Sequence, residues 1–237
     1  MDDFSRSVVM ILGASGNLGQ ACVEVFHQRG AKVLLVDRSS EALDAAFSMP
    51  EHARHSLMGG IDLSDEDVVH RMVSTVEAKF GRIDVLVNTV GVFRGGQPVQ
   101  DEPRETWDLL LSVNLFAALI ASREVVPLML KNRAGRIINV VSRNALVGVA
   151  NYAAYSAAKA ALLRLSESLA GELKESDITV NCVVPGTIDT PQNRAAMPNA
   201  DSNQWVTPAA IADVIAFLAS NAARSVTGSA IPVYGKG

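Results

Sequence analysis

The stretch Ser7–Gly19 reads SVVMILGASGNLG: an apolar run that ends in a glycine-rich segment, with a helical pattern beginning a few residues later. Short apolar runs of this kind are typical of buried parallel strands. Glycine lets the backbone turn sharply where other residues would be strained. The order of strand, tight turn and helix therefore predicts the first unit of an open α/β sheet.

The glycines in this turn are spaced GxxGxxG. A helix N-terminus offers free N–H groups and a positive dipole end, and glycine lets a pyrophosphate approach the backbone closely. We therefore expect the turn to bind a dinucleotide, although similar spacings also occur in ordinary turns. The expected contacts are Gly13, Ser15, Gly16, Asn17, Leu18 and Gly19.

The rest of the chain alternates apolar runs with helical patterns. Strands are predicted at residues 32–36, 55–58, 83–87, 137–141, 178–184 and 230–233, and one long helix at about 106–131. No repeat or break in composition divides the chain. The predicted fold class is α/β: one domain over residues 1–237, with a Rossmann-like, doubly wound parallel sheet of about seven strands and helices on both faces. The polar stretch 191–205 lacks periodicity, so we expect a mobile lid there.

Composition and charge exclude several classes of protein. The net charge is −4 without a long basic cluster, so neither nucleic acid nor a membrane is expected as a partner. The first residues are acidic where a signal peptide would be basic, which favours a cytoplasmic location. Cys22 and Cys182 read as buried thiols in a reducing compartment. The four histidines lack the spacing of metal ligands, so no metal site is predicted.

The second predicted strand ends in an acidic residue, Asp37, 24 residues after Gly13. A carboxylate there can accept hydrogen bonds from an adenosine ribose and would repel a 2′-phosphate, which favours NAD. Arg38 could instead pair with that phosphate, so NADP stays open. A helix cap is the other interpretation of Asp37, and Ser39 and Ser40 are equally good candidates for that cap.

The stretch 136–159, RIINVVSRNALVGVANYAAYSAAK, contains a possible proton-transfer device. Ser142 follows an apolar strand, at the edge where open α/β sheets bind ligands. Tyr155 and Lys159 are four residues apart and so share one face of a helix. A fixed cation favours phenolate over phenol, lowering the tyrosine pKa toward the range of a general acid or base. Otherwise Tyr155 is a partly buried anchor and Lys159 a solvated lysine.

Together with the glycine turn, these residues resemble the short-chain dehydrogenase/reductase family, whose catalytic positions match Asn114, Ser142, Tyr155 and Lys159. The resemblance implies NAD(P)-dependent hydride transfer between nicotinamide and a carbonyl/alcohol substrate. Tyr155 would be the general acid/base. Lys159 would lower the pKa of Tyr155 and hold the nicotinamide ribose, Ser142 would bind the substrate oxygen, and Asn114 would support a proton relay.

The resemblance also implies further contacts. Asp62 and Leu63 would meet the adenine, although Asp62 could equally cap a helix. The remaining cofactor residues implied are Asn88, Gly91, Tyr155, Lys159, Pro185, Gly186, Ile188 and Thr190, and the candidate substrate contacts are Phe93, Arg94, Arg143 and Arg194. In relatives, the helices that correspond to residues 106–131 and to those after Tyr152 form a dimer interface, so a homo-oligomer, a dimer or tetramer, is expected.

Two other functions remain open. Most family members have three residues between the first two glycines, whereas this chain has Asn17 where their second glycine falls. The GxxGxxG turn and the lid resemble those of dihydropteridine reductases, which reduce a quinonoid dihydropterin with NADH but generally lack the serine present here at 142. A non-catalytic NAD(H)-sensing regulator is the last alternative, and such proteins usually lose the Tyr or the Lys.

Overall fold

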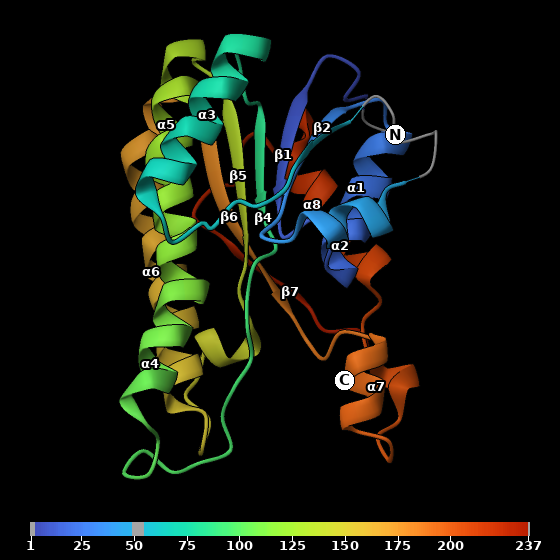
Figure 1. Cartoon of the computed structure of the whole chain (residues 1–237), viewed down its shortest axis with the longest axis vertical. Helices are drawn as coiled ribbons and strands as arrows, with labels where there is room; N and C mark the ends of the chain where they lie inside the picture. The colour runs from blue at the N-terminus through green and yellow to red at the C-terminus, as the bar shows by residue number, and fades with distance from the viewer. Residues whose placement is uncertain (1–2, 49–54, 237) are drawn as a thin grey trace.

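The computed structural model describes residues 3–48 and 55–236, which form one sheet covered by helices (Figure 1). Within these residues the sheet has seven strands, all parallel, in the order β3-β2-β1-β4-β5-β6-β7. The fold class predicted from the sequence is confirmed. The strands are β1 Val8–Leu12, β2 Lys32–Val36, β3 Ser56–Met58, β4 Val85–Asn88, β5 Gly135–Val140, β6 Ile178–Pro185 and β7 Ala230–Val233.

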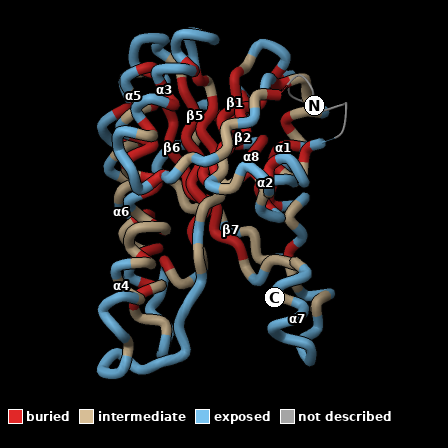
Figure 2. The backbone as a smooth tube through the Cα atoms, in the orientation of Figure 1, coloured by how far each residue is buried: buried red, intermediate tan, exposed pale blue. Residues whose placement is uncertain are grey.

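Helices lie on both faces of this sheet. Residues on β1 alternate between two apolar clusters: Val9 and Ile11 pack with α1, α2 and α8, whereas Met10 and Leu12 pack with α3 and α5. The sheet is therefore the most deeply buried layer, as Figure 2 shows. The helices are α1 Asn17–Gln28, α2 Ser40–Ala46, α3 Glu66–Phe80, α4 Arg104–Leu111, α5 Ala117–Asn132, α6 Ala153–Leu173, α7 Pro191–Ala196 and α8 Pro208–Ala219.

The turn between β1 and α1 depends on two of its glycines. Gly13 has a φ of 76°, a backbone conformation that side chains disfavour. A Cβ on Gly19 would lie 2.1 Å from the Gly13 carbonyl oxygen, so α1 can approach the turn only because residue 19 has no side chain. The first unit of the sheet therefore forms as its sequence predicts.

Two segments differ from their predictions. The single helix expected at about 106–131 is interrupted by a π-helix, η2, at Ser112–Phe116. Such insertions are rare and frequently occur at functional sites. In the predicted irregular lid, residues 191–196 form the short helix α7, which Thr190 caps by accepting a hydrogen bond from the Asn193 N–H. Capping of this kind is local chemistry that hydrophobic periodicity does not reveal.

The composite helix Arg104–Asn132 is long and apolar enough to cross a bilayer, judged by length and composition. In this fold it packs against the sheet and α3, and residues such as Asn114 and Val125 are fully buried. A core helix of a soluble domain passes the same test, so this helix is assigned to the core.

Candidate active site

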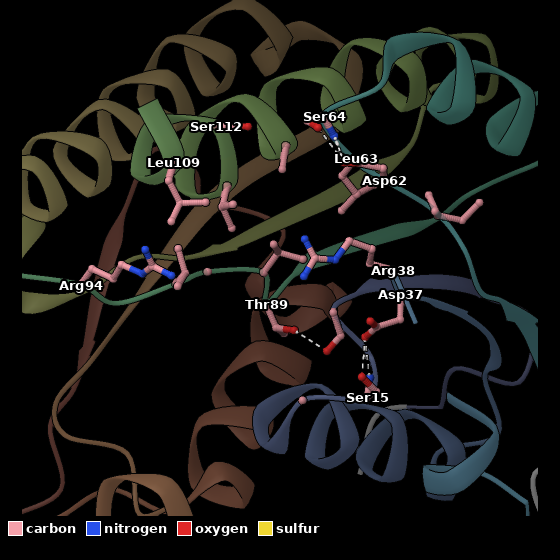
Figure 3. A pocket seen from close by; sticks show the side chains of 18 residues that line it. Ser15, Asp37, Arg38, Asp62, Leu63, Ser64, Thr89, Arg94, Leu109 and Ser112 are labelled. Carbon is pink, nitrogen blue, oxygen red and sulfur yellow. Dashed lines mark hydrogen bonds between the residues drawn. The ribbon is translucent and has the colours of Figure 1, made fainter. Parts of the chain in front are cut away.

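A cavity of about 670 Å³ lies at the carboxyl ends of the central strands (Figure 3). It is bordered by the glycine turn, the end of β2, the loop before α3, the loop after β4 and the π-helix. Asp37 and Arg94 lie at opposite ends of it in Figure 3. The predicted site residues that line it are Gly13, Ser15, Gly16, Asp37, Arg38, Asp62, Leu63, Gly91 and Arg94.

Hydrogen bonds hold the glycine turn in place from two sides. The Gly13 N–H donates to the Val36 carbonyl at 2.9 Å. From the other side, the Thr89 hydroxyl donates to the Leu12 carbonyl at 2.7 Å. The Gly13 carbonyl also lies 3.2 Å from this hydroxyl. Thr89 is a cavity residue that sequence reasoning missed, although the pairing of β1 with β4 places it beside the turn.

Asp37 holds the same turn through its carboxylate. One oxygen accepts hydrogen bonds from the backbone N–H of Ser15 at 3.0 Å and from its hydroxyl at 2.7 Å. The helix cap is Ser39, whose hydroxyl accepts from the Ala42 N–H. The capping interpretation of Asp37 is therefore wrong, and its carboxylate remains at the cavity wall.

Asp62 also lies at the cavity wall without capping a helix. One of its oxygens accepts from the N–H and hydroxyl of Ser64, and Asp65 caps α3. These Ser64 hydrogen bonds are the main reason that the pKa of Asp62 is lowered, with a smaller contribution from the charge of Arg38. The Arg38 side chain extends into the cavity (Figure 3).

The catalytic stretch meets this cavity at Gly91. A Cβ built on Gly91 would lie 3.0 Å from both the Lys159 Nζ and the Asn114 Oδ1. Lys159 is buried, and its Nζ donates to the Val140 carbonyl at 3.0 Å. The Ser142 hydroxyl lies close enough to Tyr155 to lower the pKa of its phenol. The four predicted catalytic residues therefore gather beside the cavity: Asn114 on η2, Ser142 at the start of the 3-10 helix that follows β5, and Tyr155 and Lys159 on α6.

The ionisation of these groups differs from the expectation in one respect. Burial raises the pKa of Tyr155, and the nearby Ser142 side chain opposes the change only in part. Burial also lowers the pKa of Lys159 to about 8. The predicted lowering of the Tyr155 pKa by Lys159 is wrong for the protein alone, because the ammonium is directed at the Val140 carbonyl and desolvation of the phenol dominates.

Comparison with known proteins identifies the scaffold. Residues 7–201 match the family described as short chain dehydrogenase. The chain belongs to the short-chain dehydrogenase/reductase family. It is 35% identical to the 3-oxoacyl-[acyl-carrier-protein] reductase FabG of Thermotoga maritima, over 96% of each chain.

Two solved structures show the same fold. NAD⁺-bound xylitol dehydrogenase superposes with a TM-score of 0.88 at 27% identity, covering 98% of this chain and 99% of that one. ElxO with NADP bound gives a TM-score of 0.89 at 24% identity, covering 99% and 98%. As a member of this family, the protein is an NAD(P)-dependent oxidoreductase.

Asn114 has a full set of hydrogen-bond partners within this dehydrogenase. Its amide donates to the carbonyls of Val92 and Leu110, both at 3.0 Å, and its Oδ1 accepts from the Val92 N–H at 3.2 Å. Asn114 thus joins the π-helix to the segment after β4. These hydrogen bonds satisfy the buried amide, so its presence here is explained without a proton relay.

A series of buried side-chain hydrogen bonds, which the sequence did not predict, links β4, β5 and α6 beside the site. The Asn88 amide donates to Asn139 Oδ1 at 3.3 Å, and the Asn139 amide donates to the Ser166 hydroxyl at 3.0 Å. Ser166 lies on α6, seven residues after Lys159. Asn88 is therefore a brace between strands rather than part of the cavity wall, and Asn139 ties α6 to the sheet.

Several predicted cofactor residues lie outside the cavity lining. Leu18 and Gly19 are buried against β1, and the Asn17 amide donates to Gln192 Oε1 of α7 at 2.9 Å. Gly186 donates its N–H to the Val233 carbonyl, and Ile188 forms a bridge with Val206. The residues not in the lining are Asn17, Leu18, Gly19, Asn88, Tyr155, Lys159, Pro185, Gly186, Ile188 and Thr190.

The candidate substrate residues separate into different environments. Phe93 contacts the ring of Tyr155, whereas its neighbour Arg94 lines the nucleotide cavity. The Arg143 guanidinium lies 4.7 Å from the ring centre of Tyr234. Arg194 donates two hydrogen bonds to Asp189, at 2.6 and 2.8 Å. The structure therefore does not gather the three arginines into one anion site.

No group of three or more His, Cys, Asp or Glu side chains suited to a metal ion occurs in residues 3–48 and 55–236. His52, one of the histidines considered in the sequence, lies outside the described residues. Both cysteines are free and buried.

Proposed function

We propose that this dehydrogenase transfers a hydride between a nicotinamide cofactor and a carbonyl/alcohol substrate, with Tyr155 as the general acid/base. The observation that supports this most is the junction at Gly91, where Lys159 and Asn114 reach the edge of the dinucleotide cavity. The Ser142 hydroxyl lies near the Tyr155 phenol and lowers its pKa. A nucleotide-binding scaffold without chemistry would not need this combination.

The cavity residues suit a nicotinamide dinucleotide. Gly13 and Gly16 leave the backbone open beside the first turn of α1, where free N–H groups and the helix dipole favour a pyrophosphate. Asp37 would accept hydrogen bonds from the adenosine ribose, and Asp62 and Leu63 would contact the adenine. We favour NAD, because a 2′-phosphate would lie against the Asp37 carboxylate; Arg38 is the residue that would hold such a phosphate in NADP.

In the reducing direction, the cofactor supplies the hydride when bound. The Ser142 hydroxyl donates a hydrogen bond to the substrate carbonyl oxygen, and Tyr155 delivers the proton to that oxygen. Lys159, with a pKa of about 8, remains mostly protonated at neutral pH. It can donate to a ribose hydroxyl at the cavity edge. Asn114 fixes the segment that carries Gly91, and its part in a proton relay stays a prediction.

The direct test is a screen for oxidation of NADH and NADPH with panels of ketones, quinones and a quinonoid dihydropterin. We expect turnover of at least one ketone class with NADH and a lower kcat/KM with NADPH. Tight binding of NADH without turnover of any substrate would instead identify a redox-sensing regulator. Turnover of the pterin alone would contradict the carbonyl/alcohol assignment. We rank the pterin second, because this chain has Ser142 near Tyr155, a serine that pterin reductases generally lack.

We also propose that the enzyme is a cytoplasmic homo-oligomer. The buried free thiols suit a reducing compartment. Phe116, on the helix expected at a dimer interface, is 45% exposed, which is high for a large apolar side chain. Light scattering coupled to gel filtration would distinguish a dimer or tetramer from a monomer, and a monomer would contradict this part of the proposal.

A further inference from the structure

Phe93 is a large apolar side chain left open to solvent beside the proposed catalytic tyrosine. It is 62% exposed. Its ring meets the Tyr155 ring edge-on, with centroids 4.9 Å apart and an interplanar angle of 88°. On another side it stacks with Tyr152 at 5.2 Å and 21°. Phe93 therefore joins two aromatic residues of the α6 N-terminus and still presents free apolar surface.

The segment that carries Phe93 is fixed on both sides of it. On the N-terminal side, Asn114 hydrogen-bonds both the N–H and the carbonyl of Val92. On the C-terminal side, the Gly96 N–H donates to the Asn151 carbonyl at 2.7 Å. A Cβ on Gly95 would lie 2.3 Å from the Tyr152 ring, so this close docking requires glycine. The exposure of Phe93 is thus built into the fold and does not come from a loose loop.

The charged side chains considered for substrate binding have other environments. Arg94, adjacent to Phe93, lines the nucleotide cavity, whereas Phe93 does not. Arg143 stacks on Tyr234, and Arg194 is paired with Asp189. The segment that leads from Ser142 to Tyr152 is apolar and exposed at Leu146, Val147 and Val149. The surroundings of the Ser142–Tyr155 pair therefore offer apolar and aromatic surface rather than a free cation.

We propose that the substrate is an uncharged ketone or secondary alcohol that carries an aromatic or alicyclic ring, and that this ring packs on Phe93. Stacking there would place the carbonyl oxygen of a short substituent at the hydroxyls of Tyr155 and Ser142. An aromatic pair contributes beyond the area that it buries, so Phe93 would set the selectivity for rings over chains. This inference rests on the function proposed above and names its substrate class.

The experiment compares two neutral ketones with the same number of carbon atoms, acetophenone and 2-octanone, using NADH. We expect the wild-type enzyme to have the higher kcat/KM for acetophenone. Phe93→Leu keeps an apolar side chain but removes the ring, and should lower the acetophenone-to-octanone ratio by about 3- to 10-fold. Phe93→Tyr should retain the ratio. Phe217→Leu, an exposed phenylalanine on α8, is the matched control and should not change it.

A third substrate, 4-acetylbenzoate, carries a carboxylate on the same ring and so tests whether the site prefers uncharged substrates. We expect a lower kcat/KM than for acetophenone; a clear preference for the acid would overturn the uncharged class. An unchanged ratio in Phe93→Leu would show that Phe93 only packs against Tyr155, and would overturn the inference. If the wild type is an oligomer and Phe93→Leu dissociates it, the inference is also overturned, because Phe93 would then pack against a second copy of the chain.

A separate readout keeps this inference distinct from the proposed function. If no ketone is turned over, the carbonyl/alcohol assignment fails. Calorimetric binding of acetophenone to the NAD⁺-loaded protein then tests the ring site alone. Binding that weakens by about 3-fold or more in Phe93→Leu, but not in Phe217→Leu, would support the ring site. Equal binding in all three proteins would reject it.

Discussion

At the scale of single residues, Asp37 has two tasks that the sequence shows only in part. Its position at the end of β2 predicts a ribose contact, and the structure places it at the cavity wall. Its hydrogen bonds to Ser15 also hold the glycine turn, a contact across 22 residues that no local pattern reveals. Cofactor choice and the shape of the turn are therefore coupled through one carboxylate.

Replacing Asp37 with serine should shift the cofactor preference toward NADPH. The change removes a negative charge that would face the 2′-phosphate and leaves Arg38 free to pair with it. We expect the NADPH-to-NADH ratio of kcat/KM to rise by at least about tenfold, which corresponds to about 1.4 kcal/mol. Asp44→Ser, on the exposed side of α2, should leave the ratio unchanged. A ratio that does not move in Asp37→Ser would remove Asp37 from cofactor selection.

At the scale of elements, the packing of α1 on β1 depends on Gly19. A Cβ there would lie 2.1 Å from the Gly13 carbonyl oxygen and 2.8 Å from Ala14 backbone atoms, and backbone cannot yield as a side chain can. We expect Gly19→Ala to lower the free energy of unfolding by about 3 kcal/mol and to weaken NADH binding, because the turn must move. Urea denaturation and NADH fluorescence titration measure the two effects.

The matched control is Gly171→Ala on α6, where a Cβ would meet no atom within 4 Å. In that helical position alanine should raise the free energy of unfolding by about 0.5 to 1 kcal/mol. Equal effects of the two substitutions would contradict the close approach of α1 to the turn.

The elements themselves were largely predictable, because buried parallel strands leave uninterrupted apolar runs such as those at β1, β2 and β6. The π-helix at Ser112–Phe116 was not: its Asn114 hydrogen-bonds Val92, 22 residues away, and no local pattern shows that contact. The role of Asn139 was not predictable for the same reason, because its hydrogen-bond partners Asn88 and Ser166 lie on other elements. Residues that follow a motif could be found from sequence, whereas those that join distant elements needed the fold.

At the scale of the whole molecule, burial of Lys159 makes stability depend on pH. Burial lowers its pKa to about 8, below the ordinary value of 10.5, so the unfolded chain holds more protons between these values. Burying the charged lysine therefore lowers the free energy of unfolding at neutral pH, and this loss of stability shrinks as the pH rises from about 8 to 10.5. The cost at pH 7 is about 3 kcal/mol before the hydrogen bond to Val140 is considered.

Lys159→Met should accordingly be more stable than the wild type at pH 7, with an advantage that shrinks between pH 8 and about 10.5. Lys159 and Cys182 affect each other's pKa, so the comparison is made in a Cys182→Ala background, where the thiol cannot contribute. Urea unfolding of both proteins across this pH range gives the difference directly. A constant difference would show that Lys159 is not a buried, desolvated cation.

The central claim is that the hydroxyl of Tyr155 transfers a proton during hydride transfer. Tyr155→Phe removes that hydroxyl and keeps the ring that contacts Phe93. The decisive measurement is kcat with the best ketone of the screen, alongside the Kd for NADH. We predict that kcat falls by about a hundredfold or more, while the Kd for NADH stays within about twofold of the wild-type value. A variant that binds NADH normally and keeps most of its turnover would contradict the claim.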